Sequence, residues 1–280
     1  MLVFKASKDL LAYFKAKGSR LGLVPTMGAL HQGHLSLVER ACEENEFVVV
    51  SIYINPTQFN QTSDLENYPT NLDKDKNLLA PFGEKIVVYA PEHYDLYPKG
   101  TLSKSYDFGS ITAHMEGVFR PGHFDGVATV VEALFENIQP QKAYFGEKDF
   151  QQLQVIKALN KQKKLGVSIV SCPTIREKDG LAMSSRNQLL TPEQRKAAPV
   201  IFKSLYYLKQ HYHSQSVEEM KLFFKGQMEQ HSLHLEYFFV ASVTDLTPVS
   251  KLEVHQDYRF FVAVFAGKTR LIDTLELDRI

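Results

Sequence analysis

Short apolar runs alternate with segments of helical periodicity along the first two thirds of the chain. The apolar runs lie at residues 21–24, 47–54, 86–90, 143–145 and 167–171, and they predict buried strands. Apolar residues at helical spacing predict helices over residues 10–17, from His34 onward, and over 73–80, 126–138 and 150–159. Pro25 is expected to end the first strand, and Asp149 to cap the last of these helices. Strands that alternate with helices indicate an α/β fold with a Rossmann-like parallel sheet.

The last third of the chain has a different pattern. Thr191-Pro192 marks the start of a helix that runs to about His211, and Ser216 with Glu219 forms a capping box for a second helix. Three predicted strands follow, at residues 235–241, 258–266 and 270–274. This order of elements indicates a smaller α+β domain.

The length of 280 residues is enough for about two domains and a full hydrophobic core. The change of pattern falls at Cys172-Pro173, so we predict a Rossmann-like domain at residues 1–172 and an α+β lid domain at 173–280. Cys42 and Cys172 are the only cysteines. We expect two buried free thiols, with no disulfide framework and no thiolate metal site.

The composition favours a cytoplasmic enzyme that acts on small molecules. Lys plus Arg and Asp plus Glu both number 32, so the chain lacks the basic excess typical of nucleic-acid-binding proteins. No apolar stretch reaches the roughly 18 residues needed to span a bilayer, and residues 1–5 lack the layout of a signal peptide. We therefore expect neither a nucleic acid nor a membrane as a partner.

Two histidines stand in the loop between the first strand and its helix. His31 and His34 flank Gly33 at the carboxyl end of a strand, where open α/β sheets bind ligands. The N–H groups and dipole at a helix start favour an anion such as phosphate, and two imidazoles add donors that can carry charge near neutral pH. A lone histidine there is more often a cap or a packing residue. The complete His-x-Gly-His pattern resembles a signature of the nucleotidylyltransferase superfamily, which indicates nucleotidyl transfer.

A second candidate loop lies at residues 183–187. Ser184 and Ser185 supply hydroxyl donors and Arg186 supplies a permanent cation, a combination suited to triphosphate oxygens. Alone, this pattern is common in surface loops. Together with the histidine loop, it resembles the second signature of the same superfamily.

Several separate blocks, in the same order, resemble the family of pantoate–β-alanine ligases over nearly the whole chain. The blocks are residues 25–34, 55–59, 68–69, 116–124, 145–152 and 183–187. The resemblance implies an ATP- and Mg²⁺-dependent ligation in two steps. Pantoate attacks the α-phosphate of ATP to give pantoyl adenylate and pyrophosphate, and the β-alanine amine then displaces AMP to give pantothenate. The resemblance also implies a homodimer.

The same resemblance assigns ATP to three segments of the chain. The expected ATP-binding residues are Met27, Gly28, Ala29, Leu30, His31, Gln32, Gly33 and His34, then Gly146, Glu147, Lys148 and Asp149, then Ile175, Met183, Ser184, Ser185 and Arg186. Among these, His34 is the expected catalytic proton donor and His31 its neighbour on the phosphates. Lys148 and Arg186 would supply positive charge where the reacting phosphorus accumulates negative charge.

Gln58 and Gln152 are the residues that the resemblance places on pantoate, with Gln58 also near β-alanine. A glutamine is a neutral donor and acceptor, so it can hold a hydroxy acid without quenching its carboxylate nucleophile. Taken singly, Lys148 is more simply a solvated loop lysine and Gln152 an exposed helix residue. Two further residues stay open. Arg120 is either a structural salt-bridge residue or a functional one, and Tyr68 is either a loop-packing ring or a wall of the pocket.

No residue is assigned as a metal ligand, because Mg²⁺ favours substrate phosphates and retained waters and is expected to bind mainly to ATP. The chain departs from the family at Ala133 and Glu136, where a lysine and an asparagine are usual. Both positions belong to a predicted helix outside the phosphate loops. The departure therefore concerns the helix surface or dimer contacts more than catalysis.

Two other functions remain open from the sequence. A different nucleotidylyltransferase with a phosphorylated acceptor would be expected to carry basic residues in place of the two glutamines. A catalytically silent nucleotide-binding protein or scaffold would have no need of intact His31, His34, Lys148 and Arg186. A tRNA synthetase is disfavoured, because the chain is short and lacks a basic anticodon-binding region.

Overall fold

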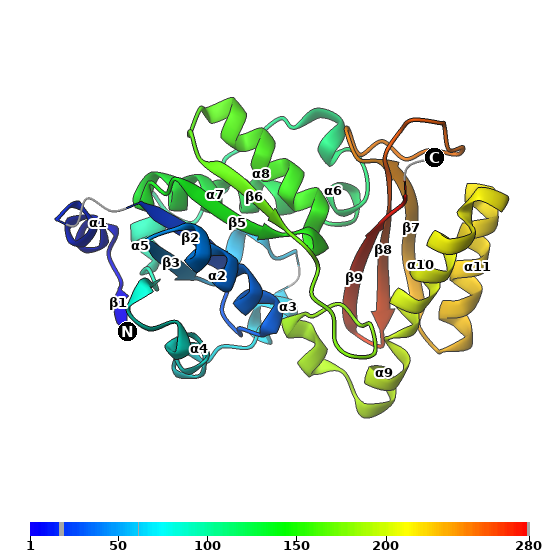
Figure 1. The fold of residues 1–280 in the computed structure, drawn as a ribbon, viewed down its shortest axis with the longest axis horizontal. Coiled ribbons are helices and arrows are strands. Elements are labelled where there is room, and N and C mark those ends of the chain that lie inside the picture. The colour runs from blue at the N-terminus through cyan, green and yellow to red at the C-terminus, as the bar shows by residue number, and fades with distance from the viewer. Residues whose placement is uncertain (17–19, 61, 279–280) are drawn as a thin grey trace. The chain divides into compact units, whose positions relative to one another are not determined.

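The computed structural model describes residues 1–16, 20–60 and 62–278, which form two compact units (Figure 1). The first unit comprises Met1–Phe108, Arg120–Gly146 and Gln152–Pro173. The second comprises Gly109–Phe119, Glu147–Gln151 and the chain from Thr174 onward. Two short segments from the first part of the chain therefore belong to the second unit, an arrangement that a single cut between residues 172 and 173 does not include.

A six-stranded parallel sheet forms the centre of the first unit. Its strands are, in spatial order, β1 (Leu2–Phe4), β4 (Ile86–Tyr89), β3 (Phe47–Ile52), β2 (Leu21–Thr26), β5 (Lys142–Gly146) and β6 (Ser168–Cys172). The strand order reverses between β2 and β5, and open α/β sheets bind ligands outside the carboxyl ends of the strands at such a point. The predicted α/β class is confirmed.

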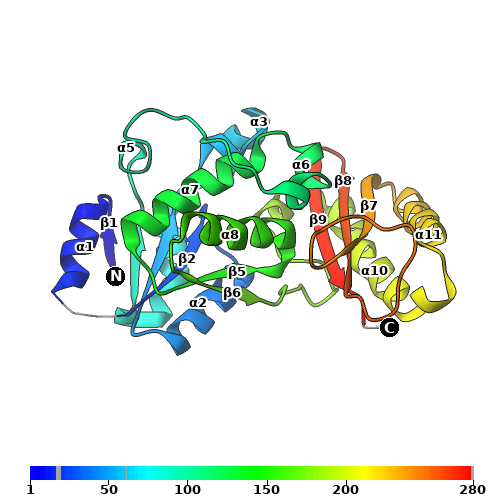
Figure 2. The ribbon, with the colours of Figure 1, turned by 90° about the horizontal axis from the view of Figure 1, so that it is seen from above.

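Helices cover both faces of this sheet (Figure 2). They are α1 (Ser7–Lys15), α2 (Gln32–Glu44), α3 (Thr62–Glu66), α4 (Leu72–Leu79), α5 (His93–Leu96), α7 (His123–Ile138) and α8 (Phe150–Lys163). α2 lies on one side of the strands, and α7 and α8 lie on the other. Val38 of α2 packs in one buried cluster with Val48 and Val50 of β3. Because both faces are covered, the central strands are continuous runs of apolar residues.

β2 continues through Pro25 to Thr26, so the prediction that Pro25 ends the strand was wrong. The carbonyl oxygen of Thr26 accepts a bond from the N–H of Tyr53 on the β3 side, so Pro25 points to the opposite, β5 side. The pairing of β2 with β5 covers only Gly22 and Leu23. The missing N–H of Pro25 therefore removes no bond from the ladder.

Other boundaries in the first unit differ by a few residues. α7 begins at His123 rather than at the predicted Gly126. α1 begins at Ser7, and the predicted end of that helix at Lys17 lies outside the described residues. The three-residue strand β1 was not predicted, since so short a run carries no periodicity. Of the two free cysteines, Cys172 is buried as expected, whereas Cys42 is only half-buried.

The second unit contains a three-stranded antiparallel sheet. The strands are β7 (His234–Ser242), β8 (Tyr258–Ala266) and β9 (Thr269–Glu276), and the helices are α6 (Glu116–Phe119), α9 (Pro192–Ala197), α10 (Val200–His211) and α11 (Val217–Gln230). α10 and α11 pack on one face of this sheet (Figure 2). Phe238, Phe260 and Val262 alternate along the strands and pack in one cluster with residues of α10 and α11, such as Leu205 and Phe224. The predicted α+β character of this part is confirmed.

The helix predicted to run from Pro192 to about His211 is two helices. α9 ends at Ala197 and α10 begins at Val200, because Pro199 has no N–H to continue the α9 ladder. The capping box at α11 is confirmed: the N–H of Glu219 donates to Ser216 Oγ at 3.2 Å, and the N–H of Ser216 donates to the Glu219 carboxylate at 2.7 Å.

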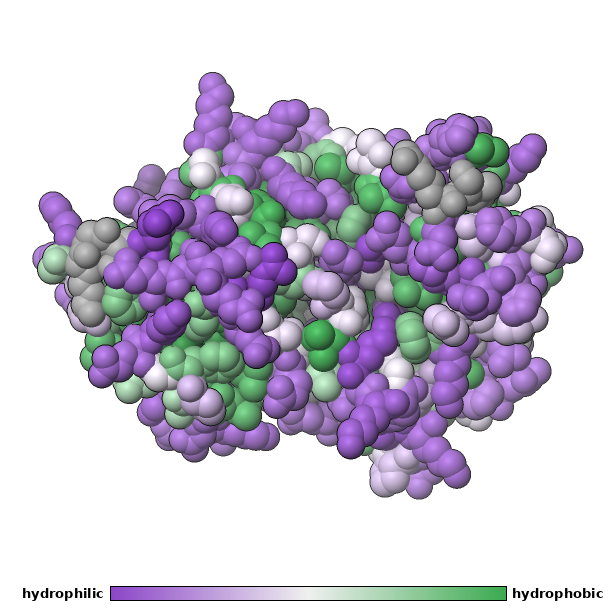
Figure 3. All heavy atoms as spheres, in the orientation of Figure 1, coloured by the Kyte–Doolittle hydropathy of each residue, from purple (hydrophilic) through white to green (hydrophobic). Residues whose placement is uncertain are grey.

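Across the described ranges, none of the helices combines the length and the apolar character that crossing a membrane requires. Hydrophilic side chains cover most of the face drawn in Figure 3, and apolar side chains form smaller groups among them.

Candidate active site

The loop between β2 and α2 is built by a short series of local contacts. Thr26 Oγ1 donates to the carbonyl oxygen of Ser51 at 2.8 Å and accepts the N–H of Gly28 at 3.2 Å. Gly28 and Ala29 then take left-handed backbone conformations, with φ of +84° and +49°. The chain turns there and reaches the start of α2, where His31 is the N-cap residue. The predicted strand–loop–helix arrangement is present.

The two histidines of this loop lie against each other. His31 Nδ1 accepts the N–H of Gly33 at 3.1 Å, which satisfies one of the N–H groups at the helix start. With Nδ1 used as an acceptor, the proton of the neutral His31 ring resides on Nε2. The rings of His31 and His34 are 4.0 Å apart between centroids, with 32° between their planes. The structure therefore brings together the two imidazoles at the amino end of α2.

Asp75 of α4 is a component of this loop that the sequence reasoning missed. Its carboxylate is buried and accepts the N–H of Ala29 at 3.1 Å on one oxygen and the N–H of Leu30 at 2.8 Å on the other. Burial raises the pKa of the Asp75 carboxyl, and these two N–H bonds partly oppose that rise. One signal was available: Leu78 and Leu79 follow Asp75 at helical spacing, so Asp75 shares their inward face.

Gln58 lies at the end of a short 3₁₀ helix that follows β3, and its side chain contacts the histidine loop. Gln58 Nε2 lies 3.3 Å from Met27 Sδ, so two of the predicted site residues meet. Gln58 Oε1 accepts from Asn55 Nδ2 at 3.1 Å. Asn55 is itself buried, and its Oδ1 accepts from the hydroxyls of Thr57 at 3.0 Å and Tyr97 at 2.5 Å. The Gln58 amide is therefore oriented by a buried network.

Gln152 and its neighbour Gln151 differ in what their side chains do. Gln151 is buried and holds the segment before α6: its Oε1 accepts the N–H of Glu116, and its Nε2 donates to the carbonyl oxygens of Ile111 and His114 at 2.8 and 2.9 Å. Gln152 is half-buried. The first is thus a structural residue.

Tyr68, which the sequence left open, is buried. Its ring packs edge-on against Phe59 at 5.7 Å between centroids, as a loop-packing ring does.

The predicted phosphate segment after β5 is held by an arginine. Glu147 accepts from the guanidinium of Arg259 at 3.1 Å, and the buried Arg259 lies over the ring of Phe150 at 4.1 Å. Lys148 Nζ is 3.4 Å from the Asp149 carboxylate. The Glu147 side chain is therefore engaged with the protein, whereas the Lys148 ammonium is tied only loosely to its neighbour.

The second predicted loop is a tight segment in which Ile175 and Met183 lie side by side. The N–H of Met183 donates to the carbonyl oxygen of Ile175 at 3.0 Å. Ser184 Oγ then accepts the N–H of Arg186 at 3.3 Å, and Ser185 is buried while Arg186 is half-buried. These predicted ATP residues of the second unit therefore belong to one local structure.

Arg176, next to Ile175, anchors that structure to β9. Its guanidinium makes two bonds to the buried carboxylate of Asp273, at 2.7 and 3.0 Å. The same guanidinium lies 3.8 Å from the centre of the Phe202 ring of α10. The base of the loop is thus fixed by this side chain in addition to the backbone bond between Met183 and Ile175.

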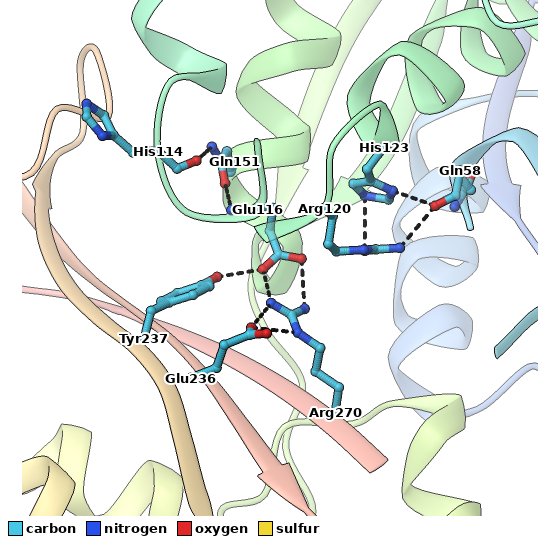
Figure 4. Close-up of polar contacts among 9 residues, drawn as sticks. All are labelled: Gln58, His114, Glu116, Arg120, His123, Gln151, Glu236, Tyr237 and Arg270. Carbon is cyan, nitrogen blue, oxygen red and sulfur yellow. Dashed lines mark hydrogen bonds and ion pairs between the residues drawn. The ribbon is translucent and has the colours of Figure 1, made fainter. Parts of the chain in front are cut away.

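A buried ion cluster in the second unit involves Glu116 of the 116–124 block (Figure 4). Glu116 accepts two bonds from Arg270, at 2.6 and 2.9 Å, and one from the hydroxyl of Tyr237 at 2.7 Å. Arg270 also donates to Glu236 at 2.8 and 2.5 Å. Burial and the neighbouring Glu116 raise the pKa of the Tyr237 hydroxyl well above its ordinary value. Sequence reasoning gave Glu116 no partner.

Ala133 and Glu136, the two departures from the family pattern, lie on α7. Glu136 is exposed and Ala133 is half-buried, so both contribute to the outer part of the helix. Among the described residues, no three His, Cys, Asp or Glu side chains come together as a possible metal site.

A doubly wound parallel sheet with paired histidines at the helix start beside its switch point defines a nucleotide-binding enzyme of the nucleotidylyltransferase class. Residues 3–276 match the family model described as pantoate-beta-alanine ligase. The chain belongs to the pantoate-beta-alanine ligase family.

Individual relatives agree with this assignment over nearly their whole length. The pantothenate synthetase of Flavobacterium psychrophilum is 42% identical, over 99% of this chain and 100% of that protein, and that of Christiangramia forsetii is 46% identical over 94% of each. A crystal structure of pantothenate synthetase from Thermus thermophilus has a TM-score of 0.90 at 41% identity, with 99% of each chain covered. A Francisella tularensis pantoate-beta-alanine ligase, described as complexed with beta-gamma ATP and beta-alanine, has a TM-score of 0.83 at 36% identity, covering 99% of this chain and 97% of that one.

Proposed function

We propose that this protein joins pantoate and β-alanine at the expense of ATP, releasing pantothenate, AMP and pyrophosphate. A pantoate carboxylate oxygen forms a bond to the α-phosphorus while the α–β phosphoanhydride bond breaks. The β-alanine nitrogen then bonds to the acyl carbon, the acyl–phosphate bond breaks, and the amine loses a proton. The observation that carries the proposal is the paired histidines at the start of α2, with the Gln58 amide in contact with Met27 of the same loop.

In the first step, the histidine loop binds the phosphates of ATP. The N–H groups and positive end of α2 favour an anion there, and the Nε2–H of His31 adds a donor. His34 is the proton donor to the phosphate oxygens as negative charge develops at phosphorus. The family resemblance also assigns to Lys148 and Arg186 the supply of positive charge to the triphosphate, and to Ser184 and Ser185 the role of hydroxyl donors.

The two glutamines bind pantoate. Asn55 donates to Gln58 Oε1 and one N–H of Gln58 Nε2 is directed at Met27 Sδ, so the second N–H of Nε2 is the group that suits an acceptor such as a carboxylate or hydroxyl oxygen. Gln152 would add a second neutral hydrogen-bonding group. A neutral pocket leaves the pantoate carboxylate able to act as a nucleophile, whereas a phosphorylated acceptor would require cations.

Mg²⁺ enters this proposal as a partner of ATP. The described residues supply no cluster of three potential ligands, and both oxygens of the buried Asp75 are used by backbone N–H groups. Mg²⁺ bound to phosphate oxygens shields their negative charge, and no step here is assigned to a protein-held metal.

The resemblance further supports a homodimer that works in the cytoplasm. Light scattering on the purified protein tests the first point: a mass of one chain would contradict it.

The test of the reaction is isotopic. The purified protein is given ATP, Mg²⁺, β-alanine and pantoate labelled with ¹⁸O in its carboxylate. One labelled oxygen should appear in AMP, because the carboxylate oxygen that attacks phosphorus leaves with AMP. AMP release at an equal rate without pantoate, or unlabelled AMP, would contradict the proposal.

The role of His34 has its own test. His34→Ala should lower kcat about a hundredfold through lost stabilisation of the transition state. The matched control is His231→Ala, which alters an exposed histidine at the end of α11. Equal kcat values for the two variants would remove His34 from the chemistry.

A further inference from the structure

Arg120 and His123 lie at the start of α7, in the 116–124 block, and both reach one backbone atom of the Gln58 loop. Arg120 Nη2 donates to the carbonyl oxygen of Gln58 at 3.1 Å, and His123 Nδ1 lies 2.9 Å from the same oxygen (Figure 4). His123 is buried and Arg120 is half-buried. The two lone pairs of this carbonyl are therefore both engaged by side chains that are distant in sequence.

The protons of this contact are fixed by the partners. The Gln58 carbonyl can only accept, so His123 Nδ1 must donate. Arg120 Nη1 lies 3.2 Å from His123 Nε2, and a guanidinium can only donate. His123 Nε2 is then the acceptor, and the ring is the neutral tautomer with its proton on Nδ1. Arg120 thus donates directly to the Gln58 carbonyl oxygen. It also fixes the tautomer of the His123 ring, which donates to the same oxygen.

The packing of α7 on the Gln58 loop is close because Gly126 has no side chain. A Cβ at Gly126 would lie 2.4 Å from the carbonyl oxygen of Thr57 and 2.8 Å from the backbone nitrogen of Gln58. At this distance the carbonyl of Gly126 also accepts from Asn55 Nδ2 at 3.1 Å. The backbone of Gln58 is thus restrained on one side by Gly126, and its carbonyl by Arg120 and His123.

We infer that Arg120 and His123 are positioning residues for Gln58, and through it for pantoate. The inference rests on the proposed function, in which Gln58 binds pantoate. The peptide carbonyl of Gln58 and the Gln58 side chain share one Cα, so fixing the first limits where the amide can point. Without the Arg120 and His123 side chains, Gln58 is free to sample other orientations. A binding group that must first be ordered binds more weakly.

The experiment measures KM for each substrate separately. Arg120→Ala and His123→Ala should each raise KM for pantoate about tenfold, the effect of losing a hydrogen bond that orders a binding group, while KM for ATP stays within about twofold. His123→Asn should recover most of the loss, because an asparagine amide places a donor near the position of Nδ1. The matched control is Asn60→Ala: Asn60 donates to the carbonyl oxygen of Pro121 in the same block, at 2.6 Å, and does not bond Gln58.

A double-mutant cycle separates positioning from direct contact with pantoate. In a Gln58→Ala background, Arg120→Ala should add less than about twofold to KM for pantoate, because the group that it positions is already gone. A full further loss in that background would mean that Arg120 binds pantoate itself, which overturns the inference. Thermal melting of each variant identifies any that fails to fold. In that case His123→Asn, the most conservative change, decides alone: its KM for pantoate is compared with that of a folded His123→Gln variant.

Failure of the inference differs from failure of the proposed function. If the unmodified protein makes no pantothenate, the function itself is wrong. If the unmodified protein is active and folded Arg120 and His123 variants keep their KM for pantoate, only the positioning role is overturned.

Discussion

The two loops that we assign to ATP are each held by a buried carboxylate from their own unit, but they are held differently. In the first loop, residues 27–34, Asp75 accepts directly from the backbone N–H groups of Ala29 and Leu30. In the second, residues 183–186, Asp273 binds the side chain of Arg176, which precedes the loop. Asp75 therefore fixes the backbone of the first loop, whereas Asp273 anchors the base of the second loop.

This difference predicts different behaviour of the two loops. A loop whose own N–H groups are satisfied by a fixed acceptor has its conformation set before ligand arrives. In the second loop, Asp273 holds the side chain of Arg176, which precedes residues 183–186, and not the N–H groups of the loop itself, so the tip of this loop is the part that we expect to change when phosphate binds. We expect the first loop to keep its backbone conformation on binding ATP and the second to rearrange.

The largest expected effect comes from breaking the anchor of the second loop. Asp273→Ala should lower the free energy of unfolding by about 3–5 kcal/mol, because it removes a buried carboxylate and leaves the half-buried Arg176 guanidinium without its ion-pair partner. Denaturant titration measures this. Asp179→Ala is the control, since Asp179 pairs with Arg195 near the surface and such pairs contribute below about 1 kcal/mol. Equal losses for the two variants would show that Asp273 is no buried anchor.

Asp75→Ala should lower the free energy of unfolding less than Asp273→Ala does, but it should weaken ATP binding more. The buried N–H of Leu30 and the partly buried N–H of Ala29 lose their acceptor, which costs about 2–3 kcal/mol, and the loop loses its shape, so KM for ATP should rise about tenfold or more. Asp73→Ala, at an exposed acid two residues earlier on the same helix, is the control and should change neither quantity appreciably. An Asp75→Ala variant that folds and keeps its KM for ATP would contradict the comparison between the loops.

Gly28→Ala tests the shape of the first loop more gently. Its φ of +84° disfavours any side chain, and the new Cβ would lie 3.1 Å from Asp75 Oδ2. The expected loss of stability is about 1–2 kcal/mol. Gly122→Ala, with a left-handed φ of +78° and nothing within 4 Å of its Cβ, isolates the conformational part and should lose less. A larger loss at Gly122 would show that Asp75 does not confine the loop.

A carboxylate near the surface gives the smallest effect and calibrates the others. Glu44, at the end of α2, accepts from Lys142 Nζ at 2.8 Å and from the hydroxyl of Tyr144 at 3.0 Å. The bond from Lys142, followed by that from Arg40, lowers the pKa of Glu44 from 4.5 to about 2. Because Glu44 is solvent-accessible, Glu44→Gln should cost under about 1 kcal/mol at pH 7.

The pH dependence gives the sign of that effect. A folded pKa below the unfolded value means that ionised Glu44 stabilises the fold above about pH 4.5, and that this contribution is lost as pH falls toward about 2. Unfolding of Glu44→Gln and of the unmodified protein should therefore differ at pH 7 and converge near pH 2. A constant difference across this range would exclude the ionised form as the cause.

Features encoded by neighbouring residues could be predicted from the sequence. The strand–loop–helix around His31 and His34 and the capping box of Ser216 and Glu219 depend on residues within a few positions of each other, and each appears as expected. The break at Pro199 was also encoded locally but was overridden by the apolar periodicity that continues on both sides of it.

Features that depend on distant partners could not be predicted. The helical spacing of Asp75 with Leu78 and Leu79 indicates an inward face, but nothing in the sequence shows that the partners of its carboxylate are the N–H groups of Ala29 and Leu30. For Arg120 the sequence left open a salt bridge or a functional role. Neither alternative included its bond to the Gln58 carbonyl, because a backbone acceptor has no signature in the sequence.

The pairing of Glu116 with Arg270 spans 154 positions of the chain, and this has a consequence for biosynthesis. On the ribosome, Glu116 emerges long before Arg270 is translated. Its carboxylate therefore stays hydrated while the strands of the parallel sheet pair. Contacts of such long sequence separation close late, since the loop entropy is lost before the ion pair forms. A nascent polypeptide halted before Arg270 should therefore leave the segment around α6 accessible to proteases.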